Sequence, residues 1–284
     1  MSYETIYLGP LGRLTAIMVP GGGYDADPIE FGGLHEPLSG VATKDIFGHR
    51  RRYSIGLDGL DPRTLSWLEM LFYGAVEQPH YIRDTRRANL LKPRVSTSMS
   101  YPFDPSSSTP TYANPGGGVL TPVAATTPYL PVAGVLSPGP TRAVQWAPAA
   151  ANVLTDAVLT PVLPGETVIF SCYVQAGAPT LEIVPYNAAL APQTAITGTT
   201  VVAGTPPRRW VSYTVPSNGT IVAVAPQIRA SAAGTFTTYA WMLSTSLSDW
   251  VMGTGCPKVI FDTFPQHRER LGKYTSATAT LREA

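Results

Sequence analysis

The chain has 284 residues and a formal net charge of +1, and it contains 28 prolines and 26 glycines. This length favours two compact units, and so much proline and glycine without a repeat indicates many short elements joined by turns. The small net charge excludes a global attraction to nucleic acid or anionic lipid, and the 44% content of hydrophobic residues excludes a disordered chain.

The cysteines and the N-terminus indicate synthesis in a reducing cytoplasm. Cys172 and Cys256 are too few for a secreted disulfide scaffold, so we expect two free thiols, in different domains. The N-terminus lacks a basic region followed by an apolar run, and no stretch reaches the roughly 18 apolar residues of a membrane span. We therefore expect no cleaved signal and no membrane segment.

The distribution of charge divides the chain. Residues 96–245 hold only eight of the 39 charged residues and no lysine. We therefore predict a split domain, residues 1–95 and 246–284, that encloses an inserted domain, residues 96–245. The Ser/Thr/Pro-rich stretch from residue 96 to 110 is typical of a linker or extended arm. The alternative is one continuous β domain with a polar-poor middle.

The first flank predicts strands and one helix. A strand over residues 6–19 is interrupted by glycine and proline, and a second covers residues 51–57. Asp61 is a helix cap followed by Pro62, and the apolar stripe of the helix contains Leu65, Trp67, Leu68 and Leu71. Gly74 marks its end. Residues 81–84 form a strand that leads into a basic turn at 85–89.

The middle of the chain predicts a sandwich. In residues 167–175, Val168, Phe170, Cys172 and Val174 share one face, while Ser171, Tyr173 and Gln175 share the other. Other β-branched and aromatic runs cover residues 142–146, 181–186, 210–215, 221–228 and 235–243. The last flank adds strands at 256–261 and 275–281. The prediction is a mainly β protein: a β-barrel or sandwich domain, split between N- and C-terminal segments and carrying one α-helix, with an inserted jelly-roll β-sandwich.

The sequence offers no constellation for catalysis. The four histidines lie outside metal-ligand spacing, and nucleophile-elbow, phosphate-loop and zinc-protease motifs are absent. Residues 96–245 contain four scattered acids, whereas polysaccharide hydrolysis would need a carboxylate pair. We expect no enzymatic activity, no metal and no cofactor.

Two arginine clusters suit one of two roles. They consist of Arg50, Arg51, Arg52, Arg83, Arg86 and Arg87. Either they bind nucleic acid, or they form a subunit interface in which planar guanidinium groups pair with carboxylates. Nearby Asp45, Asp58, Asp61 and Asp84 favour the interface, so we expect no specific nucleic-acid partner.

The aromatic residues of the middle domain also allow two interpretations. On inner faces they are core, which is the default for Trp and Tyr in a sandwich. On an exposed face they would form a platform for sugar rings. The candidate glycan-binding residues are Tyr173, Gln175, Trp210 and Arg209.

The flanks resemble minor tail proteins of long-tailed phages of actinobacteria. The resemblance is carried by residues 7–12, by 48–54, by the Asp-capped helix, by Tyr81–Leu91, where Thr85 replaces a usual proline, and by the Trp-x-x-Gly-x-Gly-x-Pro turn at Trp250–Pro257. The middle is similar to family 4/9-like carbohydrate-binding modules at residues 163–171, 209–216 and 239–243.

The resemblance implies a distal-tail type subunit in the virion, at the tail tip, with a tail-tube-like split domain. It implies a homo-oligomeric ring, with a hexamer favoured over a trimer, that contacts the tail tube, tape-measure and tip hub proteins. The sandwich would project from the ring and contact host cell-wall polysaccharide. The alternative function is a receptor-binding protein for host glycans.

Overall fold

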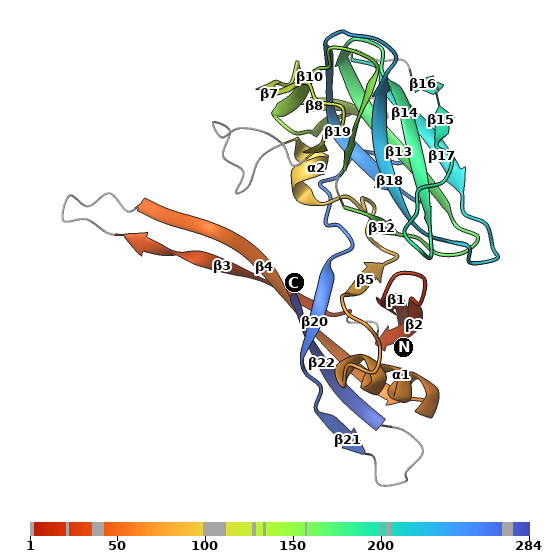
Figure 1. Cartoon of the computed structure of the whole chain (residues 1–284). Coiled ribbons are helices and arrows are strands. Elements are labelled where there is room, and N and C mark those ends of the chain that lie inside the picture. Colours follow the sequence, from red (N-terminus) through yellow and green to blue (C-terminus); the bar gives the residue numbers. More distant parts are fainter. Residues whose placement is uncertain are drawn as a thin grey trace. The chain divides into compact units, whose positions relative to one another are not determined.

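The computed structural model describes residues 3–20, 23–35, 43–98, 112–126, 129–132, 135–156, 158–198, 200–202, 206–268 and 275–284. It confirms the predicted mainly β fold class (Figure 1). The chain forms two compact units. The split unit comprises Met1–Thr85 and Pro257–Ala284, and the inserted unit comprises Arg86–Cys256. No helix among the described residues is both long and apolar enough to cross a membrane.

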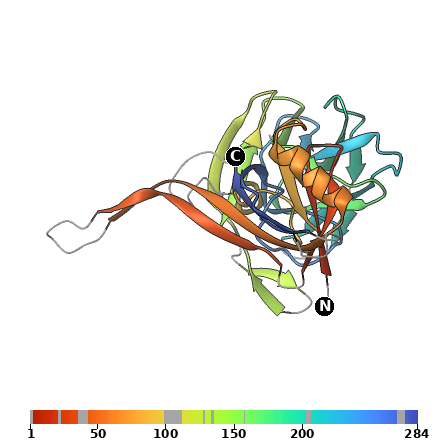
Figure 2. The same ribbon diagram turned by 90° about the horizontal axis from the view of Figure 1, so that it is seen from below.

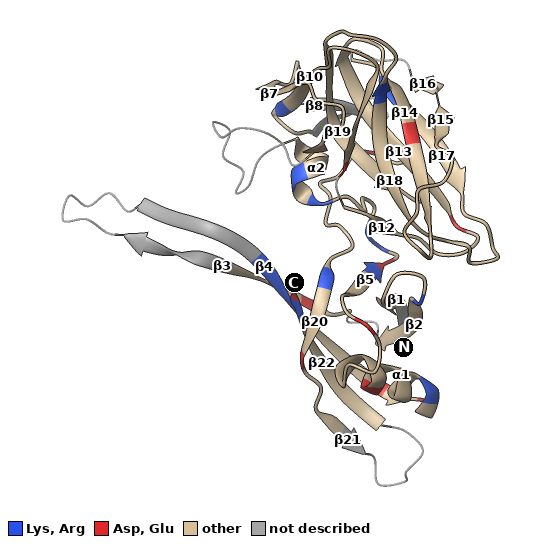
Figure 3. Cartoon of the chain, in the orientation of Figure 1, with Lys and Arg blue, Asp and Glu red and all other residues tan. Residues whose placement is uncertain are grey.

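These unit boundaries differ from those drawn from charge. Residues 86–95 and 246–256 belong to the inserted unit, although the change in charge placed them with the flanks. The strands of the sandwich carry few charged residues, as Figure 3 shows. Hydrogen bonds within the inserted unit, described below, hold both of these segments and explain the difference.

One antiparallel sheet forms the split unit. Its order is β2-β1-β5-β20-β22-β4-β3, with β21 pairing β22 beside this path. The strands are β1 (Tyr3–Gly9), β2 (Thr15–Pro20), β3 (Asp25–His35), β4 (Thr43–Leu60), β5 (His80–Asp84), β20 (Lys258–Thr263), β21 (Gln266–Arg268) and β22 (Thr275–Glu283). Because β20 and β22 lie between β5 and β4, segments from both sides of the insertion build the same sheet.

The helix α1 (Pro62–Phe72) begins where the sequence predicts. The carboxylate of Asp61 accepts hydrogen bonds from the backbone N–H groups of Arg63 and Thr64, and Pro62 occupies the first turn. Leu68 and Leu71 are fully buried in a core shared with β1, β2, β4, β5, β20 and β22. The Trp67 Nε1 donates to the Leu8 carbonyl 3.2 Å away, which fixes the helix on β1.

Strands β3 and β4 extend beyond this sheet as a two-stranded arm. β22 pairs β4 only from Leu60 to Arg52, whereas β3 continues to pair with it as far as Thr43. The nine residues of β4 from Thr43 to Arg51 therefore project about 30 Å at roughly 3.3 Å per residue. Figures 1 and 2 show this hairpin leaving the rest of its unit. Among the described strands, neither outer edge of the arm is paired.

Two antiparallel sheets form the inserted unit. The β13 sheet has the order β16-β17-β13-β19-β10-β7, the β18 sheet has the order β15-β14-β18-β11-β6 with β12 beside β18, and β8 pairs β9 separately. The strands are β6 (Tyr112–Ala113), β7 (Val119–Ala124), β8 (Tyr129–Val132), β9 (Val135–Pro138), β10 (Arg142–Ala147), β11 (Asn152–Asp156), β12 (Thr160–Pro161), β13 (Thr167–Ala176), β14 (Thr180–Asn187), β15 (Ile196–Gly198), β16 (Thr200–Val202), β17 (Arg208–Thr214), β18 (Ile221–Ala230) and β19 (Phe236–Ser244).

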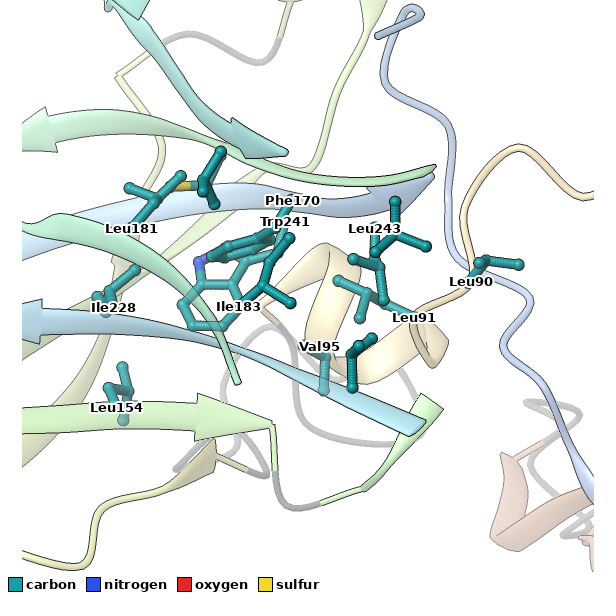
Figure 4. Close-up of a cluster of buried hydrophobic side chains, with 14 of the residues drawn as sticks. Leu90, Leu91, Val95, Leu154, Phe170, Leu181, Ile183, Ile228, Trp241 and Leu243 are labelled. Atoms are coloured by element: carbon teal, nitrogen blue, oxygen red, sulfur yellow. The ribbon is translucent and has the colours of Figure 1, made fainter. Parts of the chain in front are cut away.

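The core of the sandwich follows the predicted alternation of β13. Val168, Phe170, Cys172 and Val174 face the β18 sheet and are at most 4% exposed. Trp241 lies at the centre of this core (Figure 4). The core also contains Cys256, so the two free cysteines lie in one domain and not in two as predicted.

A short helix missed by the sequence analysis closes one end of the sandwich. α2 (Pro93–Thr97) begins with a proline and packs against β19. The hydroxyl of Thr97 donates to the Pro93 carbonyl, and Ser98 ends the helix in the left-handed conformation at φ 55°. Ser96, Thr97 and Ser98 are buried, so this part of the predicted linker is structural. The remainder of that linker, residues 99–110, lies outside the described residues.

The buried Asn89 side chain joins the two ends of the inserted unit. Its Nδ2 donates to the carbonyls of Trp241 at 3.2 Å and Val251 at 2.8 Å. Its Oδ1 accepts from the backbone N–H groups of Leu91 at 3.1 Å and Leu243 at 3.2 Å. One amide therefore connects the chain before the sandwich, the strand β19 and the chain after the sandwich.

Gly253 permits the close approach of these two chain segments. Its N–H donates to the Ser96 hydroxyl at 2.8 Å, and an added Cβ would lie 2.1 Å from the Leu91 carbonyl oxygen. Thr254 N–H donates to the Asn89 carbonyl, and the Arg87 guanidinium donates to the Thr254 carbonyl. Except for Ser96, these residues belong to the Tyr81–Leu91 and Trp250–Pro257 motifs of the sequence analysis.

We predict that Asn89→Ala destabilises the inserted unit by at least about 3 kcal/mol, because four backbone groups lose partners and each loss costs about 1–3 kcal/mol when the group is buried. The control is Asn218→Ala, which removes an exposed side chain that accepts two hydrogen bonds from Thr220. It should cost less than about 1 kcal/mol. Urea unfolding followed by tryptophan fluorescence measures both; equal losses would contradict the role assigned to Asn89.

Candidate functional site

The outer face of the β13 sheet carries the aromatic residues proposed for sugar stacking. Tyr173 on β13 lies opposite Tyr239 on β19, and their ring centroids are 5.7 Å apart. Around them lie Ala143, Ala240, Met242 and Trp250, which complete a small apolar cluster outside the main core. Tyr173 therefore has the aromatic neighbour that a platform needs.

The predicted residues divide between the two faces of this sheet. Trp210 pairs with Ser171 and shares the outer face with Tyr173, as period-2 alternation requires. Arg209 points to the opposite face, with the core residue Val211, and donates to the Pro179 carbonyl at 3.1 Å. The neighbouring Arg208 occupies the outer face instead, with its guanidinium carbon 5.8 Å from the Tyr173 ring centroid. Alternation from Trp210 could have identified Arg208 from sequence.

The platform is covered by the same chain. We call Thr245–Cys256 the outgoing segment, because it follows β19 and leaves the inserted unit. Its Trp250 packs on the aromatic cluster and is 8% exposed, and Tyr173 beneath it is 3% exposed. Arg208 donates to the Ser248 carbonyl at 2.7 Å and to the Ser171 hydroxyl at 2.8 Å. A sugar therefore has no access to Tyr173 in this conformation.

Gln175 is also engaged. Its Oε1 accepts from the Thr126 N–H at 2.9 Å, and its Nε2 donates to the Ala124 carbonyl at 3.3 Å. The side chain thus holds the chain that follows β7 against the edge of the face. Of the four predicted glycan-binding residues, Tyr173 is buried on this face, Arg209 and Gln175 are hydrogen-bonded to backbone groups, and Trp210 is partly buried on this face.

A β-bulge creates the aromatic pair. Between Tyr173 and Ser171 the partner strand advances from Tyr239 to Met242, so β19 carries an extra residue. Ala240 at this point has φ 53°, a left-handed conformation that alanine rarely adopts. The bulge places Tyr239 on the outer face while Trp241 remains in the core. Sequence alternation alone gives no signal for such an irregularity.

Several polar atoms of the covered face lack partners. The Tyr239 hydroxyl, the Trp250 Nε1 and the Arg208 Nε are buried and form no hydrogen bond among the described residues. Burial raises the pKa of the Tyr173 and Tyr239 hydroxyls and lowers that of Arg208. A buried polar group without a partner costs about 1–3 kcal/mol, so the closed conformation carries an energetic penalty.

The arginines proposed for a subunit interface occupy different environments. In the split unit, Arg52 lies 3.3 Å and Arg282 lies 2.9 Å from the Asp262 carboxylate, and Arg50 is exposed. Arg83 is 2% exposed on β5 and Arg51 is half-buried. In the inserted unit, Arg86 is exposed and Arg87 holds the outgoing segment. Arg50, Arg52 and Arg86 are thus the most exposed members of the two clusters.

Another charged cluster lies on the β18 sheet. Glu182 is 1% exposed and accepts hydrogen bonds from the Gln227 Nε2 and from the Arg229 Nε, the latter at 2.6 Å. The carboxylate is thus paired within its own sheet. No group of three or more metal-ligating side chains occurs among the described residues.

No protein-family model matches the sequence, and no curated protein shows significant similarity to it. Among solved structures, the chain is similar to the enzymatically active domain of tailspike protein 4 of bacteriophage CBA120, with 11% identity and a TM-score of 0.37, over 56% of this chain and 22% of that chain. It is similar to the C-terminal family 22 carbohydrate-binding module of Clostridium thermocellum Xyn10B, with 12% identity and a TM-score of 0.34, over 52% of this chain and 92% of that chain.

A third similarity is to a chain of the phage P2 baseplate in its activated conformation, with 11% identity and a TM-score of 0.18, over 88% of this chain and 100% of that chain. The chain spans less than a quarter of the tailspike domain. At these identities and TM-scores the likenesses assign neither a family nor a function.

Asp156 is a buried carboxyl group of the inserted unit, 4% exposed near the start of the sandwich. Its Oδ1 accepts from the Val158 N–H at 3.0 Å, but burial dominates and raises the pKa of Asp156 to about 6. Since the folded pKa lies above the ordinary value of 3.8, the folded state binds the proton more tightly than the unfolded state. The unfolding free energy must therefore fall as pH rises from about 4 to about 6.

We predict that Asp156→Asn removes this fall in stability. Between pH 4 and pH 7, the unfolding free energy of the variant should rise relative to that of the wild type by up to about 3 kcal/mol. This figure follows from about 1.4 kcal/mol per unit of pKa shift. Asparagine keeps an acceptor for the Val158 N–H. Asn218→Ala, at an exposed position of the same unit, removes no ionisable group, so it is the control and should show no such change. Urea unfolding at both pH values measures the difference; a constant difference for Asp156→Asn would disprove the assignment.

Proposed function

We propose that this protein is a structural component of a phage tail. Within that class, the role we favour is a distal-tail type subunit that forms a ring at the tail tip and links the tail tube to the tip. The proposal is supported by the resemblance of the flanking segments to minor tail proteins. The observation that carries it is the two-stranded arm of the split unit.

The arm needs a partner to be stable in water. A two-stranded hairpin alone is at most marginally stable, and an unpaired strand edge is a ready site for another chain. A ring of identical subunits supplies such a partner at every position, because each subunit presents one surface to the next and a different surface to the previous one. The arm is therefore the element that we expect to lie on a neighbouring copy.

The exposed arginines suit the same contact. Arg52 and Arg282 share one carboxylate, that of Asp262, and the neighbouring Glu283 carboxylate accepts from the backbone N–H of Arg51. Planar guanidinium groups are favoured at protein interfaces, where they pair with carboxylates. Arg50 lies two residues from Arg52, on the same face of β4. We propose that these side chains contact acidic groups of the neighbouring copy or of tail proteins above and below the ring.

The inserted sandwich has a secondary role in this proposal. Its two ends meet at Asn89, so the unit can be carried on a subunit without interrupting the sheet that the split unit forms. The aromatic residues of the outer face of the β13 sheet are of the type that stacks on sugar rings, so we propose contact with host cell-wall glycan once this face is uncovered. A receptor-binding protein in which this contact is the main function remains the second candidate, and both roles are non-catalytic.

The test of the ring is an arm deletion. Asp27 and Arg52 are register partners, so an Asn-Gly turn in place of residues 28–51 would close a short hairpin at that pair. We expect the full chain to form a hexamer or trimer by mass photometry and a ring by electron microscopy, and the deletion variant to be a monomer. The circular dichroism spectrum reports whether the deletion variant is folded. A monomeric full chain that is absent from tails would overturn the proposal.

A further inference from the structure

The first part of the outgoing segment, residues 245–250, covers the aromatic face with few polar contacts, namely one hydrogen bond from Arg208 and the attraction between Arg208 and Asp249. Residues 245–250 form neither helix nor strand, and Leu247 is exposed. Among the described residues, the hydrogen bond from Arg208 to the Ser248 carbonyl is the only one between residues 245–250 and the face below. The other bonds of this stretch are local, between Ser246 and its neighbours Ser244 and Ser248.

The attachment is much stronger immediately after this stretch. Val251 is held by the Asn89 amide, and Gly253 is held by the Ser96 hydroxyl. Residues 245–250 lie between this anchor and the end of β19. They can therefore lift from the face while the junction at Asn89 stays intact, so that Trp250 moves without unfolding of the sandwich.

The face below Trp250 has the chemistry of a saccharide site. Two tyrosine rings offer an apolar surface for the flat face of a sugar ring, and the indole of Trp250 is buried in the same apolar cluster. Arg208, Ser171 and the Tyr239 hydroxyl surround this surface with hydrogen-bonding groups. Sugar hydroxyls at the rim would give the buried Tyr239 hydroxyl the partner that the indole ring does not provide.

We propose that the outer face of the β13 sheet is a saccharide-binding site that the outgoing segment keeps closed, with Trp250 in the place of a sugar ring on Tyr173 and Tyr239. Ligand binding and closure then compete for one surface. The apparent affinity of the full chain is reduced by the fraction of molecules in which residues 245–250 are lifted. This inference rests on the glycan contact in the proposed function and not on ring formation.

The test uses Trp250→Ala in the full chain, with Leu247→Ala as the matched control from the exposed side of the same stretch. The probes are purified arabinogalactan, laminarin and xylan in affinity gel electrophoresis. Trp250→Ala should bind at least one of them ten-fold or more tightly than the wild type, and Leu247→Ala should bind as the wild type does. Adding Tyr173→Ala to Trp250→Ala should abolish the gain, because it removes half of the platform.

Hydrogen exchange of the wild type gives a second measurement. It tests whether saccharide binding opens residues 245–250, even if Trp250→Ala fails to fold. A saturating amount of the bound polysaccharide should increase exchange at residues 245–250 while β13 and β19 stay protected. The proposal is overturned if neither the wild type nor a folded Trp250→Ala binds any of the three probes, or if binding leaves exchange at residues 245–250 unchanged. It is also overturned if folded Trp250→Ala binds a synthetic 245–252 peptide but no polysaccharide, because the face is then a peptide groove.

Mass photometry of the same samples separates this proposal from the tail role. Trp250 lies in the inserted unit, so Trp250→Ala should leave the oligomeric state unchanged. Loss of polysaccharide binding with an intact ring counts against the saccharide site alone. A monomeric wild type that binds polysaccharide counts against the ring alone.

Discussion

The architecture depends on one buried amide. Asn89 satisfies two carbonyls and two N–H groups that belong to three different parts of the inserted unit. Asparagine is the side chain that offers both donors and acceptors at this length without a charge. Because the chain before and after the sandwich meets at this residue, β5 and β20 can pair as neighbours although more than 170 residues separate them. Holding the two ends of the insertion together lowers the entropy cost of bringing β5 and β20 side by side.

The arginine group of the split unit and the aromatic face of the inserted unit, to which we assign the two proposed roles, differ in how their polar groups are hydrogen-bonded. On the split unit, Arg52 and Arg282 already have a carboxylate, so a neighbouring subunit would add to an existing ion-pair network. On the inserted unit, a tyrosine hydroxyl, an indole nitrogen and a guanidinium nitrogen of the covered aromatic face have no hydrogen-bond partner within the part of the chain that the structure describes. The charged groups of the first surface already have partners, whereas polar atoms of the second surface still need hydrogen-bond partners. This contrast is why we place assembly on one unit and recognition on the other.

The sequence predicted those features that depend on local pattern. The Asp61 cap, the alternation of β13 and the strands near residues 6–19, 51–57 and 275–281 all follow from spacing and turn chemistry, and the structure has them. The change in charge placed residues 86–95 with the flanks because this stretch contains three arginines and a lysine, whereas hydrogen bonds of Asn89 hold it in the inserted unit.

The candidate site was only partly predictable. Tyr173 and Trp210 share a face as alternation requires, and the same rule excludes Arg209 in favour of Arg208. The presence of Tyr239 on this face depends on a bulge at Ala240, and the burial of Tyr173 depends on a segment more than 70 residues later in the chain. Neither has a local signature, because both result from how distant parts of the chain pack.

The order of strands in the split unit also determines when each part can fold during synthesis. β5 and β4 emerge from the ribosome early but are not neighbours in the finished sheet, since β20 and β22 lie between them. The whole sandwich is translated before these two late strands exist. A domain generally folds as a unit once its chain is available, so we expect the sandwich to fold first. During that time the edges of β4 and β5 that pair with β22 and β20 in the finished sheet remain unpaired. The nascent chain is then most exposed to aggregation during that interval, and a slow-folding sandwich would lengthen it.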